Sequence, residues 1–196
     1  MNEVFSIQLH NRQLYEQSKD GVWLDMPTTT EQLQAALRQI GISADNPQDF
    51  FINGYSYPEG QRPALSYDMV LAADVDELNF LAARLGQLDA AEIAELNAAL
   101  QNPKGGFASI GQIIDFTENV DYYVHLPDVH TAAALGDYYL NRSGMVDMPQ
   151  EWKAGIDTAQ FGRHISQQEQ GAFTEYGYIV KSDDEWQRVH EGQPVP

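Results

Sequence analysis

The chain has 196 residues, of which 43% are hydrophobic and 11% aromatic, so it is rich enough in apolar side chains to fold around a core. Its 29 acids and 11 bases give a net charge of -18, which argues against direct binding to nucleic acid or to an anionic membrane, since both need Lys and Arg. The absence of cysteine excludes disulfides, thiolate zinc sites and a cysteine nucleophile.

The first third of the chain, residues 1–63, predicts a small β-rich subdomain with one helix. Alternating or β-branched apolar residues predict strands over residues 3–9, 21–24 and 50–52. The pair Thr28 and Glu31 has the spacing of a capping box and predicts a helix that ends at Gly41. A stretch rich in Gly and Pro, residues 53–66, predicts a loop and a subdomain boundary.

Residues 64–106 predict a helical subdomain that is rich in acids. Two further capping-box pairs, Asp74 with Glu77 and Asp89 with Glu92, predict the starts of two helices. Leucines and isoleucines at helical spacing follow each pair, and the first of these helices is expected to end at Gly86.

Residues 107–196 predict a third, mixed subdomain. Helices are expected after Ser109, over residues 128–141, at Pro149 and after Asp157, with strands at 121–126 and 171–180. Beyond Lys181 we expect a frayed tail. The fold class predicted for the whole is therefore α+β, as an elongated chain of three small subdomains.

Carboxylates stand singly among apolar residues through the middle of the chain. From Ala64 to Asp137 there are twelve acids and two bases, Arg84 and Lys104. This spacing predicts negative charge held on folded surfaces, although an ordinary acidic surface has the same composition. The candidate partner-binding carboxylates are Asp68, Asp74, Asp76, Glu77, Asp89, Glu92, Glu95, Asp115, Glu118, Asp121, Asp128 and Asp137. For Asp74 and Asp89 a helix-capping role is an equally good interpretation.

Enzyme motifs are not apparent. The chain has no phosphate-binding glycine motif, and Ser109 is misplaced for a nucleophile elbow and better placed as a helix cap. His125 and His130, with Asp128 between them, lack the spacing of a known metal motif. We therefore expect no catalytic residue, no metal and no cofactor, although pairs of acids leave a carboxylate-based hydrolase as an alternative.

Several short segments in a fixed order resemble one family. They are 23–27 with Glu31, 51–55, 76–79, 116–123, 144–149, 156–157, 161–165 and 173–179. Together these segments resemble the ArdA antirestriction proteins over most of residues 20–180.

The resemblance implies a DNA mimic, carried on a mobile genetic element, that occupies the DNA-binding groove of type I restriction–modification enzymes and blocks restriction, with modification as a further target. It also implies a homodimer formed through the C-terminal subdomain. Because the start of the chain, Met1 to Val4, lacks the basic region of a secretory signal, we expect a cytoplasmic protein. An acidic adaptor that binds another basic protein is the main alternative.

Overall fold

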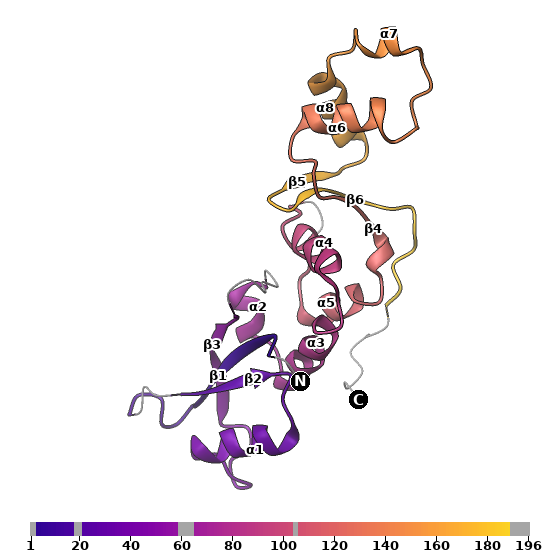
Figure 1. Cartoon of the computed structure of the whole chain (residues 1–196). Coiled ribbons are helices and arrows are strands. Elements are labelled where there is room, and N and C mark those ends of the chain that lie inside the picture. The colour runs from indigo at the N-terminus through magenta and orange to yellow at the C-terminus, as the bar shows by residue number, and fades with distance from the viewer. Residues whose placement is uncertain (1–2, 18–20, 59–64, 104–105, 189–196) are drawn as a thin grey trace. The chain divides into compact units, whose positions relative to one another are not determined.

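The computed structural model describes residues 3–17, 21–58, 65–103 and 106–188. These residues group into two compact units. Unit 1 comprises Met1–Leu88, Phe107–Glu118 and Arg188–Pro196, and unit 2 comprises Asp89–Gly106 and Asn119–Gln187. Both units contain helices and antiparallel strands, so the predicted α+β class is confirmed (Figure 1). The three subdomains 1–63, 64–106 and 107–196 stay a prediction.

A three-stranded antiparallel sheet in the order β2-β1-β3 forms the N-terminal part of unit 1. Its strands are β1 (Phe5–Asn11), β2 (Val22–Met26) and β3 (Phe50–Ser56). The alternating apolar residues that predicted β1 face the core as expected: Phe5, Ile7 and Leu9 are all fully buried.

Helix α1 (Thr30–Gln39) follows β2, and its predicted capping box was wrong by one residue. The hydroxyl of Thr29 accepts a hydrogen bond from the Gln32 amide, and the Gln32 side chain accepts one from the Thr29 amide. Thr28 is instead buried, and its amide donates to the Asn79 side chain at 2.6 Å. Gly41, at φ 79°, follows the helix in the left-handed conformation that favours glycine.

The loop predicted over residues 53–66 was wrong for residues 53–56. Strand β3 continues to Ser56, because Gly54 and Tyr55 pair with Gln8 and Ile7 of β1. The Tyr55 ring also packs edge-on against Phe5, with 5.6 Å between ring centroids. A short helix, α2 (Tyr67–Leu71), begins directly after the predicted loop. Residues 59–64 of that loop lie outside the described part.

Helices α3 (Val75–Leu85) and α5 (Ile110–Phe116) pack against each other in unit 1. Leu78, Leu81 and Leu85 of α3 are buried as the helical spacing predicted. The Ser109 hydroxyl accepts a hydrogen bond from the Gln112 amide, so its capping role is confirmed. The predicted capping box at Asp74 was wrong, since Asp74 precedes α3 but its side chain forms no capping hydrogen bond.

Unit 2 contains a second antiparallel sheet, in the order β4-β6-β5, together with the remaining helices. In chain order its elements are α4 (Ala90–Leu100), the 3-10 helix η1 (Val120–Tyr122), β4 (Tyr123–Leu126), α6 (Ala132–Asn141), α7 (Gln150–Lys153), α8 (Thr158–Gln168), β5 (Ala172–Thr174) and β6 (Gly177–Lys181). The predicted helix over 128–141 therefore begins later, at Ala132, whereas the helix after Asp157 begins as predicted.

The single strand predicted over residues 171–180 is a β-hairpin. Strands β5 and β6 pair antiparallel, with Thr174 opposite Gly177. The Thr174 hydroxyl donates to the Gly177 carbonyl at 2.9 Å and accepts from the Tyr176 amide at 3.1 Å, which closes the turn. Gly177 has φ 116°, a conformation that side chains rarely adopt, and this glycine permits the reversal.

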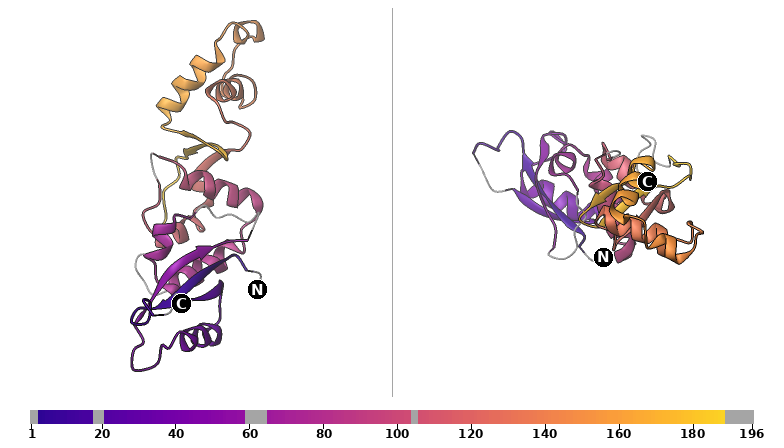
Figure 2. Two further views of the ribbon diagram at one scale, coloured as in Figure 1. Left: turned by 90° about the vertical axis from the view of Figure 1, so that its left-hand side faces the viewer. Right: turned by 90° about the horizontal axis from the view of Figure 1, so that it is seen from above.

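Helices α6 and α8 lie side by side (Figures 1 and 2). They come closest at two glycines, Gly136 of α6 and Gly162 of α8. A Cβ atom added to Gly136 would lie 1.9 Å from the Thr158 carbonyl oxygen. One added to Gly162 would lie 1.8 Å from the Ala132 carbonyl oxygen. Because both obstacles are backbone atoms, the two helices pack at this distance only with glycine at both positions.

A carboxylate joins the hairpin to these helices. The Tyr139 hydroxyl of α6 donates to Glu169 Oε1 at 2.5 Å, and the buried Tyr178 hydroxyl of β6 donates to Glu169 Oε2 at 3.1 Å. Burial and the neighbouring Glu169 raise the pKa of both phenols. Glu169, which follows α8, therefore has a structural role inside unit 2.

The frayed tail predicted beyond Lys181 was wrong for residues 182–187. Gln187 forms two backbone hydrogen bonds with the Asn119 side chain, each at 2.8 Å. The Trp186 ring packs edge-on against Tyr122, and the Ser182 amide donates to the Tyr122 carbonyl. These contacts between distant parts of the chain hold the segment in place, and residues 189–196 lie outside the described part.

Candidate protein-interaction surface

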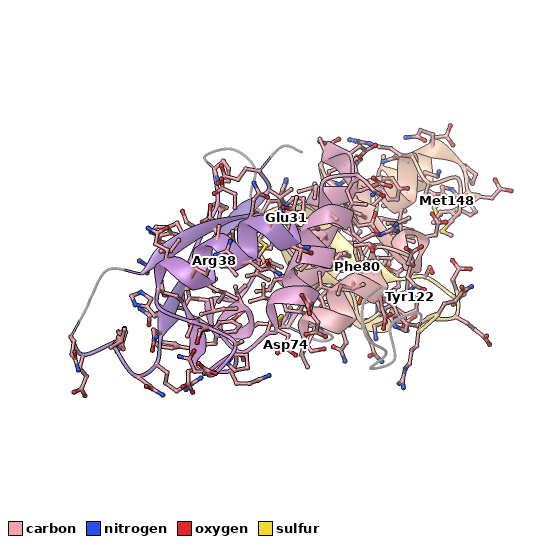
Figure 3. All side chains as sticks on the ribbon, turned by 90° about the horizontal axis from the view of Figure 1, so that it is seen from below. Glu31, Arg38, Asp74, Phe80, Tyr122 and Met148 are labelled. Carbon is pink, nitrogen blue, oxygen red and sulfur yellow. The ribbon has the colours of Figure 1, made fainter. Side chains whose placement is uncertain are left out.

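Four of the candidate carboxylates lie around the N-terminal ends of α2 and α3 in unit 1. Asp68 is in the first turn of α2, and Asp74, labelled in Figure 3, immediately precedes α3. Asp76 and Glu77 follow in the first turn of α3. Asp68, Asp74 and Asp76 are exposed, whereas Glu77 is half-buried. Negative charge is favourable at helix N-termini, so the fold tolerates these acids at little cost.

Two of the candidates, Asp115 and Glu118, lie at the end of α5 and are less available to a partner than the sequence analysis expected. Asp115 is only 6% exposed, so its carboxylate has little surface to offer a partner. Glu118 is exposed but forms an ion pair with Arg84. Arg84 also donates to the Thr117 hydroxyl at 3.3 Å, which ties α3 to the end of α5. Glu118 therefore presents a charge that is partly compensated.

Asp89 and Glu92 form the capping box of α4 in unit 2. Asp89 Oδ1 accepts hydrogen bonds from the Ala91 amide at 2.8 Å and the Glu92 amide at 3.0 Å. Glu92 Oε2 accepts one from the Asp89 amide at 2.7 Å. The capping box predicted from the sequence is confirmed, so these two acids hold the start of α4 in addition to any contact with a partner.

Glu95 lies one turn further along α4 and is half-buried. Its Oε1 atom has no solvent-accessible surface and receives no hydrogen bond in the part of the chain that the structure describes. Burial, followed by the charges of Asp121 and Glu92, raises the pKa of Glu95 to about 7. Glu95 is thus the candidate whose charge depends on pH in the neutral range.

Asp121, Asp128 and Asp137 complete the set in unit 2. Asp121 is in η1, before β4, and Asp128 follows that strand; both are exposed. Asp137 on α6 is half-buried, with Arg142 at 3.0 Å and the Asn141 amide at 2.9 Å from its carboxylate oxygens. Asp121 and Asp128 therefore present their charges to solvent more fully than Asp137 does.

One pair of acids in unit 1 escaped the sequence analysis. The Ser6 hydroxyl of β1 lies 2.7 Å from Glu3 Oε1 and 3.2 Å from Asp25 Oδ1, so it is shared by two exposed acids, one just before β1 and one on β2. The pairing of Ser6 with Asp25 depends on the strand register, and the sequence alone does not specify that register.

The histidines that were considered as metal ligands contact the β5–β6 turn instead. His125 Nε2 lies 2.7 Å from the Tyr176 carbonyl oxygen, and His130 Nδ1 lies 3.4 Å from that of Thr174. Among the described residues, no group of three His, Asp or Glu side chains is arranged to hold a metal ion. Nor does any described helix combine the length and the apolar composition needed to cross a membrane.

The fold and its charges define a class of protein: a small, strongly acidic α+β protein in which several exposed carboxylates lie at helix starts and next to strands. The comparisons with known proteins name the family. The model of the antirestriction protein family ArdA matches residues 14–180, and the chain therefore belongs to that family. A comparison with curated proteins found no match.

Proposed function

We propose that this chain inhibits type I restriction–modification enzymes by mimicking DNA. In this proposal its carboxylates occupy the positively charged groove in which the enzyme binds its substrate duplex, and DNA is excluded by competition. The observation that carries the proposal is an antirestriction family match on a chain with a net charge of -18. No bond is made or broken, so the protein acts as a stoichiometric inhibitor and not as an enzyme.

The amount of charge suits this role. B-DNA carries one charge per ~1.7 Å of helix axis, so a net charge of -18 equals that of roughly 31 Å of duplex. Within each unit the carboxylates are attached to folded helices and strands, so those of one unit already have a defined spacing before they meet the enzyme. A duplex that must bend to fit a protein pays a deformation energy, and a folded mimic does not.

The proposed contact set follows from exposure and pairing. Asp115 is left out because it is buried, and Glu118 and Asp137 rank below the others because each has an arginine partner. The remaining carboxylates of the set are Asp68, Asp74, Asp76, Glu77, Asp89, Glu92, Glu95, Asp121 and Asp128. The structure gives no reason to prefer any one of them as a discrete site.

The direct test is displacement of DNA from a purified type I enzyme. A fluorescent duplex that contains the recognition sequence is bound to the enzyme, and the chain is then titrated in. We expect the duplex to be released at about one inhibitor per DNA-binding groove. Inhibition of cleavage while the duplex stays bound would refute mimicry, and failure to bind any type I enzyme would favour an acidic adaptor for another basic protein.

Salt should weaken this inhibition. Exposed charges are screened over a Debye length of ~10 Å at 0.1 M salt and still less at higher salt. We expect the apparent inhibition constant to rise by at least ~10-fold between 50 and 300 mM salt, since the attraction is electrostatic. The measurement is a DNA-displacement titration at several salt concentrations, corrected for the weaker binding of DNA itself. An inhibition constant that does not change would indicate an apolar interface.

We further propose that two copies associate through the C-terminal part, residues 107–196. Strands β4 and β5 are the edges of the unit 2 sheet as described, and each carries an exposed apolar residue: Val124 is 44% and Phe173 is 37% exposed. Open edges with apolar side chains favour pairing between chains, and a two-fold axis would join two acidic surfaces.

Light scattering at micromolar concentration tests this association. We expect twice the 22.0 kDa of one chain for the wild type, and a shift toward the monomer for Val124→Asp and Phe173→Asp. Leu14→Asp, at an exposed apolar residue of unit 1, serves as the matched control and should leave the mass unchanged. A wild-type monomer at this concentration would contradict the proposal.

A further inference from the structure

Glu95 differs from the other acids of the set because part of its carboxylate is inside the protein. It is on α4, and its Oε1 atom is inaccessible to solvent and without a hydrogen-bond donor among the described residues. A buried charged oxygen without a donor costs free energy, and a carboxyl group avoids this cost by taking up a proton. Its burial therefore favours the neutral acid.

The groups around Glu95 act in the same direction. Glu92 lies one turn earlier on α4, Asp121 lies in η1, and Tyr123 lies in β4. Burial first, then Tyr122 and then Glu95 raise the pKa of the Tyr123 phenol to about 12. Strand β4 also carries His125, whose Nε2 atom lies 2.7 Å from the Tyr176 carbonyl oxygen. Strand β6, which packs against α4 as well, carries the titratable residues Tyr178 and Lys181.

These two β6 residues have contacts of their own. The Tyr178 hydroxyl donates to Glu169, and the Lys181 ammonium lies 5.9 Å from the centre of the Tyr122 ring. All the causes that act on the Glu95 pKa raise it: burial first, then Asp121, then Glu92. Burial and the two neighbouring acids therefore all oppose the ionisation of Glu95.

We propose that Glu95 carries a proton in the free protein and releases it when a cationic side chain approaches Glu92 and Asp121, so that binding of a basic partner is coupled to pH. The proton leaves the Glu95 carboxyl group for solvent, and the carboxylate that remains faces the new positive charge. Only the identity of the partner rests on the proposed function, because the coupling itself needs no more than a cation at this face of α4.

The direction of the pH effect follows from the Glu95 pKa. It rises from 4.5 to about 7 on folding, so the folded chain holds more protons than the unfolded chain between these values. The free energy of unfolding therefore falls as pH rises from about 4.5 to about 7. Affinity for a cationic partner changes in the opposite direction, since below about pH 7 the partner must first displace the proton.

The first measurement uses the free protein. Carboxyl carbon shifts of 13C-labelled glutamate are followed by NMR between pH 4 and pH 9, and the Glu95 signal is assigned by its loss in Glu95→Gln. We expect its midpoint near 7, and a lower midpoint in Asp121→Asn, which removes a facing charge. Asp128→Asn is the matched control at an exposed acid and should leave the midpoint unchanged. A midpoint near 4.5 would overturn the inference.

The second measurement uses a deca-arginine peptide as the cationic probe at low salt. Calorimetric titrations at pH 7 in two buffers of different ionisation enthalpy report the protons released on binding. A group with a pKa near the working pH is about half protonated, so the wild type should release up to about half a proton more than Glu95→Gln. Equal release by the two proteins would overturn the inference. If both measurements succeed but no type I enzyme binds, the proposed function fails and the proton coupling stands.

Discussion

Inhibition is expected to weaken strongly when four exposed carboxylates are replaced together, and only slightly when each is replaced alone. The four substitutions are Asp68→Asn, Asp76→Asn, Asp121→Asn and Asp128→Asn. All four side chains are exposed, so their replacement leaves the core intact. An exposed ion pair contributes only ~0–1 kcal/mol, so the combined loss should be about 2–4 kcal/mol, roughly 30-fold to 1,000-fold in the inhibition constant.

A control variant with the same change in net charge separates location from total charge. Asp45→Asn, Asp147→Asn, Glu151→Gln and Glu185→Gln remove four exposed acids outside residues 64–137. In a DNA-cleavage protection assay this variant should lose less inhibition than the first, and thermal melts of both should confirm folding. Loss of all activity from any one of the four single substitutions would contradict a distributed mimic and indicate a discrete site.

Unit 2 should be much less stable when Gly162 is replaced by alanine. The added Cβ would overlap the Ala132 carbonyl and lie 2.8 Å from the Gly136 amide nitrogen, so α6 and α8 must move apart. Overpacking typically costs about 1–3 kcal/mol, and the contact with rigid backbone on the facing helix places this case at the upper end, even after the ~1 kcal/mol that alanine gains over glycine in a helix. For a unit of this size, a loss of about 2 kcal/mol lowers the melting temperature by roughly 8 to 16 °C.

Gly155→Ala provides the matched control in the same unit. A Cβ atom at Gly155 would meet only the Trp152 carbonyl oxygen at 3.5 Å, which is an ordinary contact. Calorimetric melting should show a large shift for Gly162→Ala and little change for Gly155→Ala. If the two variants melt alike, the close approach of α6 and α8 does not control the stability of unit 2.

The charge-removal prediction concerns the free energy of binding to the enzyme, and the Gly162→Ala prediction concerns the free energy of unfolding. The carboxylates contribute to binding through many small terms, whereas the glycines contribute to folding through one steric requirement. Asp89 and Glu92 contribute to folding because they cap α4, and in the proposed function they also contribute charge to binding. Substitutions at those two acids would mix a loss of stability with a loss of binding, and for that reason neither is included in the charge-removal variant.

The sequence by itself determined the features that depend on near neighbours. The capping box of α4 was predicted because Asp89 and Glu92 bond only to amides within three residues of each other. The buried positions of β1 and α3 followed from periodicity, because each element turns one face toward the core. The net charge and the absence of cysteine likewise follow from the composition alone.

Only the tertiary structure decided which candidate acids face solvent. Asp115 and Glu118 look alike in the sequence, but Asp115 is buried and Glu118 pairs with Arg84, which is on another helix. The start of α1 depends on Asn79, which accepts from Thr28 across 51 positions of sequence and leaves the capping role to Thr29. The hairpin of β5 and β6 and the anchored segment up to Gln187 likewise depend on distant partners. A cap or a period is encoded by residues within one or two turns, whereas burial, register and ion pairing are set by groups that only the folded chain brings together.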